Sequence, residues 1–138
     1  MNVLGIIPAR YGSTRLEGKP LMDICGKPMI QRVYEQAKKI LDDVVVATDD
    51  KRIEKAVQDF DGNVVMTSSK HSTGTNRCLE AYRVFSSVTN KKYDVIINIQ
   101  GDEPLLEPEQ LRLLISCFSD DTTELATLVN PVKENENL

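Results

Sequence analysis

The residues best suited to bind an anion lie between positions 10 and 19, where the sequence reads RYGSTRLEGK. Three cations, Arg10, Arg15 and Lys19, stand against one acid in this segment, although the whole chain carries a net charge of −4. The two arginines offer forked donors that match phosphate oxygens, and the lysine adds a point charge on a long side chain. The segment is therefore predicted to bind a phosphate group.

Small and hydroxyl residues follow the first arginine. Gly12 can adopt a positive φ and bring backbone N–H groups close to an oxyanion, while Ser13 and Thr14 add hydroxyl donors. The segment resembles a Walker A loop, but five residues separate its glycines, and Pro20 follows Lys19 where that motif needs a hydroxyl for magnesium. It is therefore predicted to be a phosphate loop of another kind. A solvated basic loop without a ligand is the alternative.

An acidic turn supplies the second half of the predicted site. Asp102 follows an apolar run at residues 93–99 and the glycine at position 101. Magnesium commonly binds one or two carboxylates together with the phosphates of a substrate. We therefore predict that Asp102 binds Mg²⁺ opposite the cationic loop. Glu103 is the alternative ligand, and a solvated acidic turn is the alternative interpretation.

Apolar runs typical of strands alternate with amphipathic runs typical of helices along the chain. This alternation predicts right-handed βαβ units, and thus an α/β fold with a mostly parallel, Rossmann-like sheet. The strands are expected at residues 3–7, 43–48, 63–66, 93–99 and 125–132, and the helices at 28–41, 50–60, from 75 onward and from 108 onward.

Polar residues gather where three of these strands end. Ligands of open α/β sheets bind beyond the carboxyl ends of the strands, where the strand order reverses. If the first four strands are ordered third, second, first, fourth, the first and last of these clusters flank one crevice. The clusters are Pro8-Ala9-Arg10, Thr48-Asp49-Asp50 and Gln100-Gly101-Asp102.

The segment at residues 71–77, HSTGTNR, is another loop with many donors. Gly74 permits close backbone approach, and the helix expected after it presents its amino terminus to an electron-rich group such as a base or a phosphate. Ordinary capping of that helix by Thr73 or Thr75 is the alternative.

Composition narrows the class of protein. The chain has 138 residues, 41% hydrophobic and 28% charged, which fits one globular domain. No apolar run reaches the roughly 18 residues of a membrane span, so we expect a cytoplasmic protein that does not bind membranes. Net acidity weighs against nucleic acid as a partner. The three cysteines have no metal-site spacing and are predicted to be reduced thiols that fill the core.

Five motifs together resemble one family, the CMP-Kdo synthetases, or 3-deoxy-manno-octulosonate cytidylyltransferases. They are IIPARYGSTRLEGKPL, GKPMIQRV, VVVATDD, HSTGTNR and INIQGDEPL, in this order. Glu17 stands where the family most often has proline. The resemblance implies a three-layer αβα fold of the nucleotide-diphospho-sugar transferase type. It also implies transfer of CMP from CTP to Kdo with release of diphosphate, a step of lipopolysaccharide biosynthesis.

The resemblance also implies roles for individual residues, with Mg²⁺ as cofactor and a homodimer for the complete enzyme. Arg10, Lys19 and Asp102 would be catalytic, and Asp102 would hold the metal. The nucleotide would be bound by Pro8, Ala9, Arg10, Ser13, Arg15, Lys19, Thr48, Asp49, Ser72, Gly74, Arg77 and Gln100.

The family's sequences continue well beyond residue 138. We therefore expect residues 1–138 to form a single nucleotide-binding α/β domain, the N-terminal part of a longer fold, with weak or absent turnover alone. Two alternatives stay open, namely a CMP-sialate-type synthetase and a non-catalytic nucleotide-binding fragment.

Overall fold

Five parallel strands form the central sheet in a computed structural model that describes residues 2–12, 17–70, 74–101, 107–116 and 124–127. The strands are β1 (Val3–Ala9), β4 (Asp43–Thr48), β5 (Val64–Met66), β6 (Val95–Asn98) and β7 (Glu124–Thr127). Their order across the sheet is β5-β4-β1-β6-β7. The first four predicted strands thus have the order that was considered as a condition above, and the order reverses between β1 and β6.

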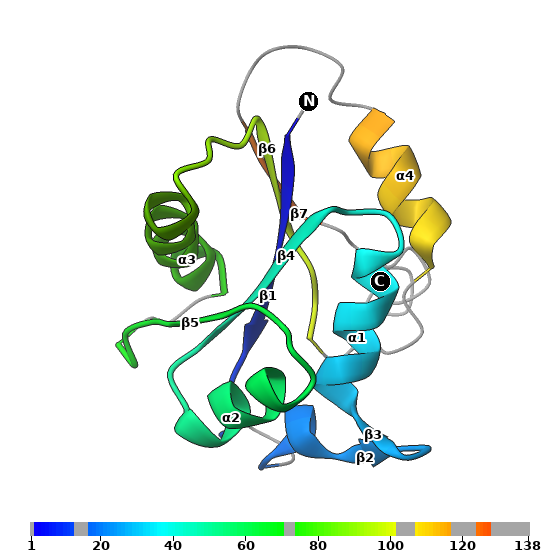
Figure 1. The fold of residues 1–138 in the computed structure, drawn as a ribbon, viewed down its shortest axis with the longest axis vertical. Coiled ribbons are helices and arrows are strands. Elements are labelled where there is room, and N and C mark those ends of the chain that lie inside the picture. The colour runs from blue at the N-terminus through cyan, green and yellow to red at the C-terminus, as the bar shows by residue number, and fades with distance from the viewer. Residues whose placement is uncertain (1, 13–16, 71–73, 102–106, 117–123, 128–138) are drawn as a thin grey trace, which may run out of the picture.

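Helices cover both faces of this sheet, as Figure 1 shows with the sheet seen nearly edge-on. The helix α3 (Gly74–Thr89) packs on one face. The opposite face carries α1 (Met29–Lys38), α2 (Lys51–Asp59) and α4 (Pro108–Ser116). The predicted three-layer αβα architecture is thus confirmed.

Successive residues of the central strands supply the two halves of the core because strand side chains alternate between faces. In β1, Leu4 and Ile6 pack with α3, whereas Ile7 and Ala9 pack with α1 and α2. Every one of these side chains is at most 3% exposed. Strands buried on both faces must be apolar at nearly every position, which explains the continuous hydrophobic runs in the sequence.

Several local boundaries differ from the sequence-based expectation. β1 continues through Pro8 to Ala9, two residues beyond its predicted end. Pro28 is the N-cap of α1 instead of its first residue. A two-residue hairpin between β2 (Asp23–Ile24) and β3 (Lys27–Pro28) follows the short 3-10 helix η1 (Lys19–Leu21), and neither was predicted, because such short elements leave no periodic pattern.

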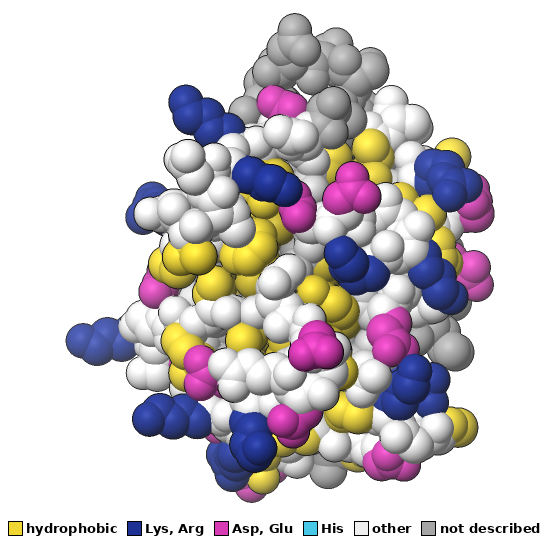
Figure 2. Space-filling model, viewed as in Figure 1, with side chains coloured by type: hydrophobic (Ala, Val, Ile, Leu, Met, Phe, Trp, Pro, Cys, Tyr) yellow, Lys and Arg dark blue, Asp and Glu magenta, His cyan; other side chains and the backbone are white. Residues whose placement is uncertain are grey.

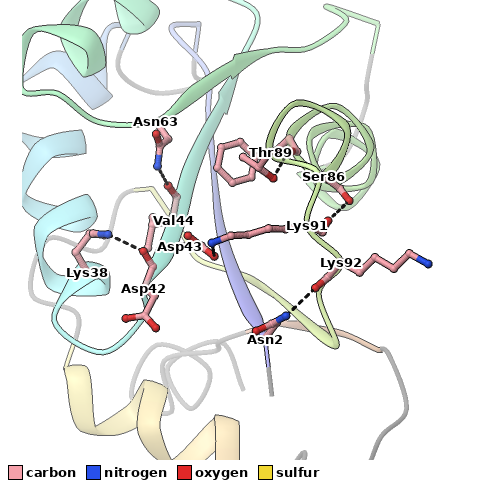
Figure 3. A network of polar contacts seen from close by, with 11 residues as sticks. Asn2, Lys38, Asp42, Asp43, Val44, Asn63, Ser86, Thr89, Lys91 and Lys92 are labelled. Carbon is pink, nitrogen blue, oxygen red and sulfur yellow. Dashed lines mark hydrogen bonds and ion pairs between the residues drawn. The ribbon is translucent and has the colours of Figure 1, made fainter.

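Polar contacts fix the amino ends of the strands, as Figure 3 shows. Asn2 donates from its backbone N–H to Asp94 at 2.8 Å and from its side chain to the carbonyl of Lys92 at 3.1 Å. Lys91 pairs with Asp43 at 3.3 Å. These contacts join the starts of β1, β4 and β6. We call this side of the sheet, where the strands begin, its amino edge, and the side where they end its carboxyl edge.

Figure 2 shows cations and anions interspersed over one face of the molecule, with hydrophobic side chains between them in the region of α3 and β5. On α3 the exposed apolar residues are Leu79, Val84 and Val88. Within the described ranges, no helix has the length and hydropathy that crossing a membrane requires.

Candidate functional site

Described residues of the three polar clusters predicted at the strand ends lie next to one another at the carboxyl edge of the sheet. Ala9 at the end of β1 is paired in register with Thr48 at the end of β4. On the other side of β1, a Cβ added to Gly101 would lie only 3.0 Å from the carbonyl oxygen of Pro8. The chain that leaves β6 therefore passes directly against the end of β1, and only a residue without a side chain fits there without a shift. Gly101 is required for this close approach and does not adopt a positive φ.

The cationic loop is closed at a neck formed by Tyr11 and Gly18. The N–H of Gly18 donates to the carbonyl oxygen of Tyr11 at 2.6 Å. Gly18 has φ +76, and a Cβ there would lie 3.1 Å from the Tyr11 ring. The positive φ that Gly12 could supply is found at Gly18 instead, where the chain returns to Tyr11, and a Cβ added to Gly12 would meet nothing within 4 Å.

Arg10 and Lys19 flank this neck on its two sides. Arg10 follows the buried end of β1 and is exposed, while Lys19 is half-buried at the start of η1. The neck therefore constrains the spacing of the backbone at these two cations. Ser13 and Arg15, which the sequence assigns to the same phosphate site, lie outside the described residues.

The end of β4 uses its polar side chains for local structure. Thr48 is fully buried, and its hydroxyl accepts from the N–H of Asp50 at 3.2 Å. Asp50 caps α2 by accepting from the N–H of Arg52 at 2.8 Å. Asp49 lies between them and is half-buried at the carboxyl edge. A contact between nucleotide and the backbone here fits this arrangement better than one with the Thr48 hydroxyl.

Arg77 is buried beneath this edge, with 1% of its surface exposed. It donates to the Thr67 hydroxyl at 2.5 Å and to the carbonyl of Ser68 at 3.3 Å, and it pairs with Asp49 at 3.6 Å. These contacts tie α3 to the ends of β4 and β5. The positive charge of Arg77 thus lies at the site, while its N–H donors bond to groups of the protein.

The other described residues predicted for the nucleotide site lie at the ends of strands or at the start of α3. Ala9 is buried, Pro8 is half-buried and Gln100 is exposed. Gly74 is the first residue of α3, so the amino terminus of that helix lies in the predicted loop. Ser72 and Asp102 lie outside the described residues. The described part of the chain holds no group of three His, Cys, Asp or Glu residues that could bind a metal.

Two residues near the loop were not among the sequence-based predictions. The guanidinium of Arg52 lies over the ring of Tyr11, with its Cζ 3.3 Å from the ring centroid. Positions 11 and 52 have no local relationship in the sequence. Only the pairing of β1 with β4, which sets the start of α2 beside the loop, brings them together.

Comparison with known proteins gives a consistent result. Residues 4–138 match the family model described as cytidylyltransferase. A 3-deoxy-manno-octulosonate cytidylyltransferase of Parabacteroides distasonis is 58% identical over 137 residues, which is 99% of this chain and 53% of that protein. The chain therefore spans about half the length of this curated relative.

Solved structures agree with the sequence matches. The structure of CMP:2-keto-3-deoxy-manno-octonic acid synthetase complexed with CTP has a TM-score of 0.79 and 46% identity, over 88% of this chain and 48% of that one. A cytidylyltransferase from Leptospira borgpetersenii gives a TM-score of 0.72 and 28% identity, over 86% of this chain and 49% of that one.

Proposed function

The chain belongs to the cytidylyltransferase family, and we propose that it forms the CTP-binding part of an enzyme that transfers CMP from CTP to Kdo with release of diphosphate. The names of the relatives favour Kdo over sialate as the acceptor. The proposal includes a role in lipopolysaccharide biosynthesis, a cytoplasmic location, a homodimer for the complete enzyme, and residues 1–138 as one nucleotide-binding domain.

One observation carries this proposal. The carboxyl ends of β1 and β6 lie in contact at the point where the strand order reverses, with Gly101 against Pro8. Arg10 and Lys19 stand at the neck of the loop that leaves β1. A cationic loop and an acidic turn thus leave the sheet from neighbouring strands, which is the arrangement a metal-bound triphosphate needs on its two sides.

Nucleotidyl transfer depends mainly on alignment and charge neutralisation. Arg10 and Lys19 would hold the triphosphate oxygens together with Ser13 and Arg15, and thereby stabilise negative charge on the departing diphosphate. The base and ribose would lie against Thr48, Asp49, Ser72 and Gly74. Gln100 would face the nucleotide or the sugar.

Mg²⁺ fits the donors available at the end of β6. Gly101 holds the chain against β1, and the next two residues in the sequence are carboxylates, the ligand type that Mg²⁺ prefers. Asp102 is our first choice as its ligand, and Glu103 is the alternative. When bound, the metal would neutralise phosphate charge and help to align the triphosphate.

Lys19→Met should weaken CTP binding by about 10- to 100-fold, because a charge-assisted contact with phosphate contributes roughly 1.5–3 kcal/mol. Cytidine, which has no phosphate, should bind with nearly unchanged affinity. Isothermal titration of the purified chain with both ligands measures this difference. Equal losses for CTP and cytidine would place Lys19 outside the phosphate site.

Asp102→Asn should weaken CTP binding in the presence of Mg²⁺ and leave the affinity measured in EDTA nearly unchanged. The physical reason is that the carboxylate acts through the metal. Titrations of wild type and variant, each with and without Mg²⁺, measure this. An unchanged metal dependence in Asp102→Asn, together with its loss in Glu103→Gln, would transfer the role to Glu103.

A further inference from the structure

Arg52 contacts the neck of the cationic loop from another element. It is the second residue of α2, which begins directly after β4. Its guanidinium Cζ lies 3.3 Å from the centroid of the Tyr11 ring. That ring lies against Gly18, whose N–H donates to the carbonyl of Tyr11 at 2.6 Å. Arg52 and Gly18 therefore both lie against the Tyr11 ring.

The guanidinium is held in a fixed plane by Asp50. Its Nε donates to Asp50 Oδ1 at 3.1 Å, and its Nη2 donates to Oδ2 at 2.8 Å. The same carboxylate caps α2 through the N–H of Arg52. A two-point contact of this kind fixes orientation as well as position. The face of the guanidinium is thereby presented to Tyr11, while its forked edge faces a carboxylate of its own chain.

Groups on both sides of the neck interact with Arg52. The pKa of Arg52 is raised, chiefly because its side chain donates to Asp50, and also because Tyr11 and the Glu17 carboxylate lie near it. Glu17 directly precedes Gly18. In addition, η1, which begins at Lys19, packs against α2. Contacts from α2 thus reach the chain both before and after the loop.

We propose that Arg52 is a positioning residue for the triphosphate. By stacking on Tyr11 while Asp50 holds it, Arg52 fixes the neck at Tyr11 and Gly18, and with it the separation of Arg10 and Lys19. This inference rests on the proposed function, since it assigns those two cations to phosphate. Arg52 acts through Tyr11 and does not itself bind the ligand.

The first test needs no ligand. Hydrogen exchange of the Gly18 amide reports directly on its bond to Tyr11. A cation–π contact of this exposure contributes roughly 0.5–1 kcal/mol, which corresponds to an exchange rate about 2- to 5-fold faster in Arg52→Met. The matched control is Lys55→Met, which removes one charge from the same helix, where Lys55 pairs with Asp59 at 3.7 Å. That variant should leave exchange at Gly18 unchanged.

The second test is a double-mutant cycle on CTP affinity. Arg52→Met and Tyr11→Leu should each weaken CTP binding by about 2- to 5-fold and leave cytidine binding unchanged, and the double variant should be no weaker than the poorer single variant. Tyr11→Phe, which keeps the ring, should bind CTP as the wild type does. Additive losses would mean that Arg52 acts on the phosphate directly, and would overturn the positioning role.

Two further results would overturn it. They are a loss in Lys55→Met as large as that in Arg52→Met, and a loss of cytidine affinity in Arg52→Met as large as its loss of CTP affinity, because the effect would then not act through the phosphates. Failure of the proposed function is distinguishable from these results. A wild-type chain that binds no CTP contradicts the proposed function and the positioning role with it, whereas unchanged Gly18 exchange in Arg52→Met contradicts the positioning role alone.

Discussion

Arg77 is a charged residue whose position is set by contacts with three neighbouring groups. Its guanidinium is buried against the Thr67 hydroxyl, the Ser68 carbonyl and the Asp49 carboxylate. Burying an arginine is tolerable only when such partners satisfy its donors. Because these partners belong to the ends of β4 and β5, Arg77 holds the backbone on which the nucleotide is proposed to lie.

Arg77→Met should lower the free energy of unfolding by about 1–3 kcal/mol, because it leaves buried polar groups without their partner. Chemical denaturation monitored by circular dichroism measures this loss. Arg83→Met is the matched control, since Arg83 is exposed on the same helix and should change stability by less than about 0.5 kcal/mol. Equal effects of the two substitutions would show that the partners of Arg77 contribute nothing to stability.

The two described cysteines differ in environment. Cys25 is exposed in the turn of the β2–β3 hairpin, so the prediction that all cysteines fill the core is wrong for this residue. Its position follows from the tight turn, where φ is positive at Cys25 and Gly26. Cys78 is buried on the side of α3 that faces the sheet, as predicted for the core, and burial raises its pKa to about 12.

This contrast predicts selective alkylation in a chain that carries Cys117→Ser. Near pH 8, iodoacetamide should modify Cys25, while Cys78 should react only after unfolding, because the reactive thiolate is scarce and enclosed. Raising the pH to 9 should still leave Cys78 unmodified, since its pKa remains far above that value. Mass spectrometry of the digested protein distinguishes the two sites. Modification of both at equal rates would contradict the burial of Cys78.

At the level of elements, Tyr34 joins α1 to two strands. Its hydroxyl donates to the carbonyl of Val44 in β4 at 3.3 Å and accepts from the N–H of Asn63, just before β5, at 3.0 Å. Its ring packs edge-on against Phe60 with centroids 5.3 Å apart. One side chain therefore sets the position of α1 relative to the edge of the sheet.

Tyr34→Phe should destabilise the fold by about 1 kcal/mol, because the N–H of Asn63 loses its acceptor. Tyr93→Phe is the matched comparison on the opposite face. The Tyr93 hydroxyl is buried and makes no hydrogen bond of standard geometry among the described residues, although Thr89 and Asp43 lie near it, so its removal should cost less than removal of the Tyr34 hydroxyl. Denaturation midpoints of the two variants measure the difference. A larger loss in Tyr93→Phe than in Tyr34→Phe would contradict the assignment of these hydrogen bonds.

At the scale of the whole molecule, the amino and carboxyl edges of the sheet carry different kinds of residues. Ion pairs and hydrogen bonds occupy the amino edge, where Asn2, Asp43 and Lys91 join three strands (Figure 3). The carboxyl edge carries the cationic loop, the buried Arg77 and the turn at Gly101. Since a ligand at that edge would contact loops from several strands, its binding should stabilise the fold as a unit.

Ligand binding should therefore be visible in thermal unfolding. CTP with Mg²⁺, at about 100 times its dissociation constant, should add about 2.7 kcal/mol to the free energy of unfolding and raise Tm by several degrees. The same CTP concentration in EDTA should give a smaller shift, and so should cytidine at that concentration. Differential scanning fluorimetry measures all three. A shift that is unaffected by EDTA would remove the metal from the proposed binding mode.

The sequence alone determined the order of the longer strands and helices, although η1, β2 and β3 were not predicted. In α1, for example, Ile30, Val33 and Ala37 recur at helical spacing and are buried, because hydrophobic periodicity is a local property of the chain. The sequence also made the observed order of the first four strands one of the few candidates, since parallel βαβ units permit few arrangements, and that order implies that two polar clusters meet.

The tertiary structure decided which residues shape the site. It assigned the left-handed turn to Gly18 instead of Gly12, buried the donors of Arg77, and stacked Arg52 on Tyr11. Each of these outcomes depends on groups that are distant in the sequence or on how tightly a loop closes. Periodicity and composition carry no information about such contacts, because they are fixed only when neighbouring strands pair and bring their loops together.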